Sequence, residues 1–204
     1  MYIHFFKRIL DILVAFLAIP FVLLALLILS PIIYLEDKGS VFYNAPRVGK
    51  NGALFTMYKF RSMKIDSPDL VMEDGSTYSG VDDPRMTKIG SFMRKTSLDE
   101  LPQFFNVLLG TMSVIGPRPD LLRETELYTG RQRDKLNMRP GITGYAAVYG
   151  RNSLEWKQRL ELDVYYIDNA SLLLDVKIFF RTFTTVFAQE GIYSDSNCKD
   201  GEDR

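Results

Sequence analysis

The chain begins with a long apolar segment, since residues 12–35 contain no charged side chain. As an α-helix these positions span about 36 Å, which exceeds the roughly 30 Å hydrocarbon core of a bilayer. The segment is longer than the apolar region of a signal peptide, and no cleavage site of the A-x-A type follows it. The pattern therefore predicts a segment embedded in a membrane.

The topology of this segment depends on its flanking charges and its prolines. Lys7 and Arg8 precede it and Lys38 follows it, so the positive-inside rule places both ends on the cytoplasmic side. Ser30-Pro31 lies past the middle, where proline removes a backbone donor and the serine hydroxyl can bond a freed carbonyl. A helix broken there returns to the same face, whereas a helix that is only kinked crosses the bilayer. The pattern is compatible with both.

The next segment, residues 39–63, contains short apolar runs at residues 41–43 and 54–58. Asn51-Gly52 lies between them, and this dipeptide between two such runs predicts a β-hairpin. Residues 66–85 are acidic, rich in Gly, Ser and Pro, and without helical periodicity. A loop of this length is typical of a disordered segment or of a lid over a functional site.

Helical periodicity returns at residues 98–109, 121–136, 153–168 and 171–189. In the last segment Phe180, Phe183 and Phe187 belong to one broad apolar face, and Asp175 and Lys177 lie opposite. This segment has two interpretations: a helix that faces the core, or an amphipathic helix in the plane of a membrane surface. The whole pattern predicts a helix-rich α+β fold.

Composition restricts the chemistry more than the fold. The 204 residues suffice for one domain, and 47% hydrophobic with 25% charged residues excludes extended disorder. Lys+Arg and Asp+Glu both total 25, and this balance argues against nucleic acid as a partner. One cysteine and one histidine leave no intrachain disulfide, no multi-cysteine metal site and no two-histidine metal site, and they argue against Ser-His-Asp catalysis. Any chemistry must depend on Asp, Glu, Lys, Arg and hydroxyl groups.

The most suggestive polar segment is residues 94–102, which reads Arg-Lys-Thr-Ser-Leu-Asp-Glu-Leu-Pro. A structural interpretation is a helix capping box, since Ser97 is followed three residues later by Glu100. The functional alternative uses the adjacent carboxylates of Asp99 and Glu100, which suit Mg²⁺ binding or attack on phosphorus. Arg94, just upstream, would offset the repulsion between a carboxylate and a diphosphate.

Three further arginines lie on loops stiffened by proline or glycine. Arg118 stands in Gly-Pro-Arg-Pro, Arg139 begins Arg-Pro-Gly-Ile-Thr-Gly, and Arg151 follows Gly150. Arginine binds phosphate in a bidentate manner, so these loops suit a phosphate-bearing substrate, although solvated surface turns have the same composition. Phosphate loops of the GxxxxGK[ST] and GxGxxG types are absent, which argues against a kinase or a nicotinamide dehydrogenase.

Several segments, taken in order, share a pattern with one known family. They are Lys59-Phe60-Arg61-Ser62-Met63, Asp83-Pro84-Arg85-Met86-Thr87-Lys88-Ile89-Gly90, Ser97-Leu98-Asp99-Glu100-Leu101-Pro102-Gln103, Asn106-Val107-Leu108, Met112-Ser113, Gly116-Pro117-Arg118-Pro119, Arg139-Pro140-Gly141-Ile142-Thr143-Gly144 and Asp163-Val164-Tyr165-Tyr166. The chain thereby resembles the bacterial sugar transferase family of monotopic phosphoglycosyl transferases. The match runs to about residue 187, which implies the minimal form of the family without additional transmembrane helices.

The resemblance implies transfer of a sugar 1-phosphate from a UDP-sugar to undecaprenyl or another polyprenyl phosphate, with release of UMP. This is the first membrane step of glycoconjugate synthesis. The resemblance implies Asp99 as the nucleophile that forms a covalent phosphosugar intermediate, and Glu100 beside it as a ligand of Mg²⁺. Arg94 resembles a phosphate ligand, and Lys59, Arg118 and Asp163 resemble further active-site residues. The phosphate argument above adds Arg139 and Arg151 as substrate-binding candidates.

The resemblance also implies an organisation in three parts. Residues 1–36 form a re-entrant membrane helix broken at Ser30-Pro31. Residues 37–190 form a catalytic domain with a short β-hairpin and interfacial amphipathic helices, and residues 191–204 form a flexible tail. Both termini then lie on the cytoplasmic face of the bacterial inner membrane, with membrane lipid and downstream glycosyltransferases as further partners.

Two features depart from the family pattern. Ala147 and Tyr149 replace the usual Gln and Asn, and Asn44-Ala45-Pro46 stands where a Gln usually precedes Arg-Val-Gly. These departures leave the identity of the sugar open. Two other functions stay in competition: a membrane-anchored Mg²⁺-dependent hydrolase of nucleotide-diphosphate sugars, and a non-catalytic membrane scaffold.

Overall fold

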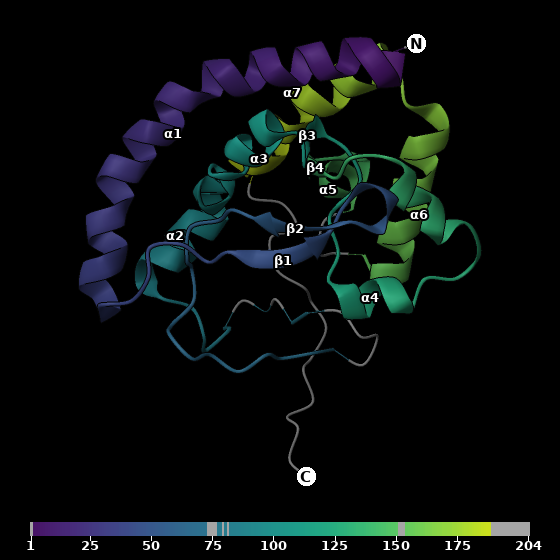
Figure 1. The fold of residues 1–204 in the computed structure, drawn as a ribbon. Coiled ribbons are helices and arrows are strands. Elements are labelled where there is room, and N and C mark those ends of the chain that lie inside the picture. The colour runs from purple at the N-terminus through teal and green to yellow at the C-terminus, as the bar shows by residue number, and fades with distance from the viewer. Residues whose placement is uncertain (1, 73–76, 79, 81, 151–153, 189–204) are drawn as a thin grey trace.

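The apolar N-terminal segment forms one continuous helix, α1 (Lys7–Asp37), which follows the π-helical turn η1 (Tyr2–Phe6) in a computed structural model. The structure describes residues 2–72, 77–78, 80, 82–150 and 154–188. Ser30 and Pro31 lie inside α1, so the predicted break is wrong as an interruption of the helix. Figure 1 instead shows α1 as a bent helix that runs over the top of the molecule and down one side. Pro31 removes one backbone hydrogen bond from the helix. Leu29 and Ile33 lie on either side of Pro31, and their packing in an apolar cluster holds the adjoining turns in place.

Helix α1 is long and apolar enough to cross a membrane, and only 17% of its most apolar window is buried in the protein. Its exposed side chains include Phe16, Leu17, Phe21 and Leu27. Such a surface is far too apolar for water and fits a hydrocarbon environment. Whether α1 crosses the bilayer or returns to the same face stays a prediction.

The predicted hairpin is confirmed, with one change in its first strand. Strand β1 (Ala45–Val48) pairs antiparallel with β2 (Leu54–Met57), and the turn η2 (Lys50–Gly52) joins them. Asn51 and Gly52 adopt φ values of 58° and 76°, the left-handed conformation that this dipeptide favours. The first strand is β1, where Pro46 is tolerated in a two-stranded sheet with free edges, while residues 41–43 pair only through an isolated antiparallel bridge from Phe42 to Phe60.

A second sheet was not predicted. Strand β3 (Ser113–Ile115) pairs in parallel with β4 (Gly141–Thr143), and each has only three residues. The ladder continues into the flanking loops, where Gly116 N donates to Thr143 O at 2.9 Å and Gly141 N donates to Pro117 O at 2.9 Å. The two proline–arginine loops therefore lie side by side, and a Cβ at Gly116 or Gly144 would collide with the facing backbone.

The remaining helices only partly follow the predicted segments. They are α2 (Lys88–Thr96), η3 (Leu98–Glu100), α3 (Gln103–Leu109), α4 (Leu122–Glu126), η4 (Gly130–Asn137), α5 (Tyr145–Tyr149), α6 (Trp156–Asn169) and α7 (Leu172–Ala188). Helices α6 and α7 confirm the last two segments, whereas residues 98–109 and 121–136 each divide into a 3₁₀ turn and a short α-helix. Helices α2 and α5 were missed. The predicted tail at residues 191–204 lies outside the described residues.

Helix α7 turns only part of its predicted apolar face to the core. Phe179 packs against the larger core cluster, whereas Phe180, Phe183 and Phe187 are exposed, so the interpretation of the whole face as core-facing is wrong. Asp175, predicted on the solvent face, is instead buried and forms an ion pair of 2.6 Å with Lys7 of α1. The helix packs beneath the first part of α1 (Figure 1) and leaves Phe180, Phe183 and Phe187 outward, and its place in the plane of a membrane surface stays a prediction.

Two clusters of apolar side chains hold together the segments that contain the predicted site residues. The larger joins α1, α3, both sheets, α5, α6 and α7, with Val107, Tyr166 and Ile178 fully buried. The second joins Leu29 and Ile33 of α1 to Phe60 and Met93. The second half of α1 is therefore packed directly against the segments that contain Lys59 and Arg94.

Candidate active site

The polar segment at residues 94–102 forms a sharp corner and not a capped helix. Ser97 has a φ of 56°, ends α2 and begins the 3₁₀ turn η3, and its side chain makes no capping hydrogen bond. The predicted capping box of Ser97 with Glu100 is therefore wrong. Thr87 caps α2 instead, through a 2.9 Å hydrogen bond from Gly90 N to its hydroxyl. The left-handed residue turns the chain so that Asp99 points into the protein.

Asp99 is almost completely buried, with 2% of its surface exposed. The Lys59 ammonium lies 2.7 Å from its Oδ2 atom and 3.6 Å from Oε1 of Glu100. Asp99 Oδ2 accepts no hydrogen bond of good geometry, so this ion pair is its main compensation. The backbone is held as well, because Phe60 N donates to Asp99 O at 2.9 Å. Three predicted residues, Lys59, Asp99 and Glu100, thus come together at one place.

Asn106 of α3 fixes the chain just before Lys59. Its Oδ1 accepts from Tyr58 N at 2.9 Å, and its Nδ2 donates to Thr56 O at 2.7 Å. The buried Asn106 amide therefore makes the backbone hydrogen bonds that a neighbouring strand would otherwise make with the end of β2. This connection sets the distance between Lys59 and the carboxylates that precede α3.

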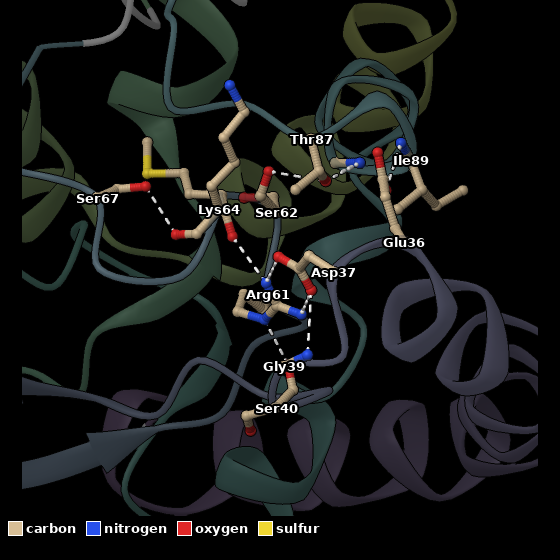
Figure 2. Close-up of polar contacts among 12 residues, drawn as sticks. Glu36, Asp37, Gly39, Ser40, Arg61, Ser62, Lys64, Ser67, Thr87 and Ile89 are labelled. Atoms are coloured by element: carbon tan, nitrogen blue, oxygen red, sulfur yellow. Dashed lines mark hydrogen bonds and ion pairs between the residues drawn. The ribbon is translucent and has the colours of Figure 1, made fainter.

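The last turn of α1 binds the segments on either side of this region, and Figure 2 shows its contacts with Arg61 and with the first turn of α2. Arg61 binds Asp37 in a bidentate manner, with N–O distances of 2.5 and 2.6 Å, and also donates to the Ser40 carbonyl. The Glu36 carboxylate accepts from Lys88 N at 2.7 Å and from Ile89 N at 3.3 Å, at the first turn of α2. The membrane helix thus holds the N-terminus of the helix that leads to Asp99.

A second polar group lies around Asp163, which is 2% exposed. Its Oδ2 lies 2.9 Å from the Lys135 ammonium and accepts from Arg118 N at 3.3 Å. Lys135 is 4% exposed and also pairs with Asp120 at 2.6 Å. Tyr128 donates to the same Asp120 carboxylate. This buried group supports the Gly-Pro-Arg-Pro loop, while the Arg118 side chain itself is exposed.

Asp120 and Asp163 both pair with the Lys135 ammonium, and this pairing shifts the pKa values of all three groups. Burial opposes charge on Lys135, but the two carboxylates outweigh it and raise the pKa of Lys135. Burial also opposes charge on Asp120, but Lys135 outweighs it and the pKa of Asp120 is lowered. Burial dominates for Asp163, whose pKa is raised. Its Oδ1 is buried without a hydrogen bond.

Sequence reasoning missed Lys135, Asp120 and Arg47 in this region. Lys135 lies in a strongly polar segment, and nothing in the local pattern indicates that its side chain is buried. Arg47, in the Arg-Val-Gly motif, is followed by Val48, whose N donates to Asp120 O at 3.0 Å, and burial and the charge of Arg118 both lower the pKa of Arg47. An anion within reach of both guanidinium groups would offset this repulsion. The motif itself was the available signal for Arg47.

Arg139 does not join either group. Its Nε donates at 2.8 Å to Gly110 O, at the C-terminal end of α3, whereas Asp99 precedes the N-terminal end. Arg94 lies in the last turn of α2, and within the described residues its guanidinium has no hydrogen-bonded partner. Arg151 lies outside the described residues. At the first departure from the family pattern, Tyr149 packs against Tyr145 at 4.5 Å and beneath Arg181 at 5.2 Å.

The acidic loop expected at residues 66–85 is held at several described positions. Arg85 is buried and donates to Asp83, to Pro68 O and to Tyr78 O. Burial acts to raise the pKa of Asp83, but the hydrogen bonds from Arg85 outweigh it and the pKa of Asp83 is lowered. Arg123 of α4 pairs with Asp69 across the loop. The predicted lid function stays a prediction.

The carboxylates are compatible with a shared metal ion. Within the described residues, no group of three His, Cys, Asp or Glu side chains converges on one point, so a closed protein metal site is absent there. Mg²⁺ commonly uses one or two carboxylates and completes its shell with water and substrate phosphates. Glu100, whose side chain is 29% exposed, lies beside Asp99 Oδ2, which pairs with Lys59 but accepts no hydrogen bond of good geometry, and it fits such a ligand.

Comparison with known proteins identifies the family of the chain. Residues 2–189 match the family described as bacterial sugar transferase. The chain is 42% identical over 193 residues to galactosyl transferase CpsE of Streptococcus agalactiae, covering 91% of this chain and 43% of that protein. It is 39% identical over 207 residues to the undecaprenyl-phosphate galactose phosphotransferase of Salmonella typhimurium, covering 93% and 42%. Exopolysaccharide production protein ExoY of Sinorhizobium fredii is 38% identical over 199 residues, covering 92% and 88%. The chain therefore spans less than half the length of the first two relatives and most of the third.

Proposed function

Because the chain belongs to the bacterial sugar transferase family, we propose that it is a phosphoglycosyl transferase. It moves a sugar 1-phosphate from a UDP-sugar to undecaprenyl or another polyprenyl phosphate and releases UMP, at the start of a membrane-bound glycoconjugate pathway. The observation that carries the proposal is the buried Asp99 carboxylate, paired with Lys59 at 2.7 Å beside Glu100 and packed against α1.

In the first step an Asp99 oxygen attacks the phosphorus that bears the sugar. A carboxylate–phosphorus bond forms, the bond to the bridging oxygen breaks, and UMP leaves with the electron pair. Lys59 supports this step, because an ammonium that lies against both carboxylates reduces the repulsion between the nucleophile and a diphosphate. Glu100, with Asp99, would hold Mg²⁺, which neutralises developing charge on phosphate oxygens.

In the second step an oxygen of the polyprenyl phosphate attacks the same phosphorus. A new diphosphate bond forms, and the bond to Asp99 breaks and returns the carboxylate. Dividing the reaction in this way lets a soluble donor and a lipid acceptor use one site in turn. The packing of Leu29 and Ile33 of α1 on Phe60, next to Lys59, brings the site close to lipid.

The arginine loop has a separate role in this proposal. Arg118 is exposed on a loop whose backbone Asp163 holds, and its charge acts on Arg47, so the two guanidinium groups suit an anionic part of a substrate. Lys135 and Asp120 act as positioning residues beneath them. Arg94 is available for a phosphate near the Asp99 corner.

We also propose that α1 returns to the same side of the bacterial inner membrane, so that both termini are cytoplasmic. The support is that both ends of α1 bind the same folded unit. Lys7 at the start pairs with Asp175 of α7, and Asp37 at the end pairs with Arg61. A straight crossing would carry one end about 30 Å away to the opposite surface, out of reach of these partners.

Intact-protein mass measured with Mg²⁺ and a panel of UDP-sugars, without lipid acceptor, tests the mechanism. The expected result is a mass gain of one phosphosugar, which is lost in Asp99→Asn and kept in the matched variant Asp134→Asn, which changes an exposed aspartate. Added polyprenyl phosphate then removes the adduct and produces the lipid-linked sugar.

Other outcomes contradict the proposal in distinct ways. Release of UMP with free sugar phosphate in the absence of any acceptor would indicate the hydrolase. Acceptor-dependent product without any adduct would leave the transferase but refute Asp99 as a covalent nucleophile. No adduct and no UMP with any donor would favour the scaffold.

A further inference from the structure

A polar cavity of about 170 Å³ lies at the start of α1, apart from the site around Asp99. This is far more than the roughly 10–15 Å³ that one water requires. Its lining comes from the turn η1, α1, the hairpin turn, β3 and the chain after η4: Ile3, Lys7, Arg8, Asp11, Lys50, Ser113, Asn137, Met138 and Arg139. The fold thus brings four basic residues together from three distant parts of the sequence.

The cavity carries an excess of positive charge. Four cationic side chains line it, and Asp11 is the one acidic residue in the lining. The Asp11 carboxylate is already occupied, since it accepts from Ser113 Oγ at 2.8 and 2.9 Å and from Val114 N at 2.9 Å. Lys7 is compensated by Asp175. Asp11 also acts electrostatically on Arg8, but Arg8, Lys50 and Arg139 form no direct ion pair within the described residues, which favours an anionic ligand.

The two arginines are held in place by the end of α3. Arg8 donates to Val107 O at 2.7 Å and to Leu108 O at 3.2 Å, while Arg139 Nε donates to Gly110 O. A guanidinium has five N–H donors, so these hydrogen bonds orient both side chains and leave further N–H donors of each arginine for a ligand. Within the described part of the chain, no acceptor occupies the terminal nitrogens of Arg139 or the Lys50 ammonium.

Exposed apolar side chains adjoin the residues that line the cavity. Ile9, Leu10 and Leu13, directly after Arg8 on α1, are exposed, and so is Leu109 at the end of α3. A phospholipid fits both features, because its headgroup phosphate can enter the cavity while its acyl chains cover these apolar side chains. The site is distinct from Asp99, because the seven residues of α3, about 10 Å of helix, separate the two.

We propose that this cavity binds the phosphate of an anionic membrane lipid and anchors the start of α1 at the membrane surface. The cavity recognises a phosphate group, which free inorganic phosphate also presents, and we assign this phosphate to a phospholipid headgroup. The proposal does not depend on transferase activity, since it is tested without donor or acceptor.

The test uses the full chain in nanodiscs of equal parts phosphatidylcholine and phosphatidylglycerol, released for native mass spectrometry. We expect preferential retention of phosphatidylglycerol, reduced about fivefold in Lys50→Gln, since one basic residue contributes about 1 kcal/mol near anionic lipid. Lys50 has no partner to lose, so the variant should fold, and its melting temperature is recorded as a check. The control Lys157→Gln, which changes an exposed lysine on α6, should retain the lipid normally.

Three results would overturn the proposal. The first is equal retention of the two lipids by the unchanged protein, and the second is unchanged preference in Lys50→Gln. The third is complete displacement of phosphatidylglycerol by millimolar inorganic phosphate, which would identify a soluble anion as the ligand. Persistence of the lipid in that competition supports the headgroup as the source.

Discussion

Replacing Lys135 by Met tests whether the buried group beneath the Gly-Pro-Arg-Pro loop stabilises the protein. The ammonium lies 2.6 Å from Asp120 and 2.9 Å from Asp163, and only 4% of the residue is exposed. Methionine has a similar length and fills the space without the charge. The substitution leaves two buried carboxylates with no ammonium, and each was compensated mainly by Lys135.

The expected cost follows from that loss of compensation. Removing one partner of a buried ion pair costs about 3–5 kcal/mol, a large part of the roughly 5–15 kcal/mol that stabilises a domain. For a chain of this size the melting temperature should fall by roughly 6–20 °C. Adding Asp163→Asn to the variant should recover part of the loss, because one of the uncompensated charges disappears. The single variant Asp163→Asn should cost less, since the raised pKa of Asp163 makes its neutral form accessible.

Thermal unfolding in detergent micelles measures the three variants, with Lys157→Met as the exposed-lysine control that should stay within about 0.5 kcal/mol. The phosphosugar mass gain is recorded in parallel, because a shifted Arg118 loop should slow adduct formation even below the melting temperature. A melting temperature of Lys135→Met equal to that of the control would refute the reasoning. So would a double variant that is less stable than Lys135→Met alone.

Three further predictions concern other contacts. Asp37→Asn removes the charge that Arg61 binds at the end of α1, and it should lower the free energy of unfolding by about 1–3 kcal/mol. Chemical denaturation in micelles measures this change. An unchanged free energy would mean that the ion pair does not hold α1. Gly90→Ala places a Cβ against the Ser62 carbonyl and should lower the free energy of unfolding by about 1–3 kcal/mol in the same assay. The comparison variant is Gly130→Ala: Gly130 has open space around it but a φ of 53°, so this variant reports the cost of backbone strain alone. Burial and the charge of Asp120 raise the pKa of Glu124, so the protein loses stability as pH rises from about 4.5 through that pKa. Glu124→Gln should remove this loss, so its melting temperature should gain on that of the unchanged protein as the pH rises above about 4.5; parallel dependences of the two melting temperatures on pH would contradict it.

Local pattern predicted those features whose cause lies within a few residues. The Asn51-Gly52 turn formed as expected because the left-handed conformation is intrinsic to that dipeptide. Helices α6 and α7 formed where periodicity placed them. The capping box failed for a different reason: Ser97 has the right spacing from Glu100, but the end of α2 forces it into a left-handed corner.

The sequence by itself determined the apolar helix, the hairpin, the order of the motifs and the two neighbouring carboxylates. Tertiary structure decided which charges meet. It paired Lys59 with Asp99 across 40 positions, buried Lys135 between two aspartates, and moved Arg139 away to the far end of α3. It also exposed three phenylalanines of α7 and buried Asp175. Burial and pairing of charge depend on contacts between distant segments, and the free energy of a charge inside a protein is set by its partners and not by its neighbours in sequence.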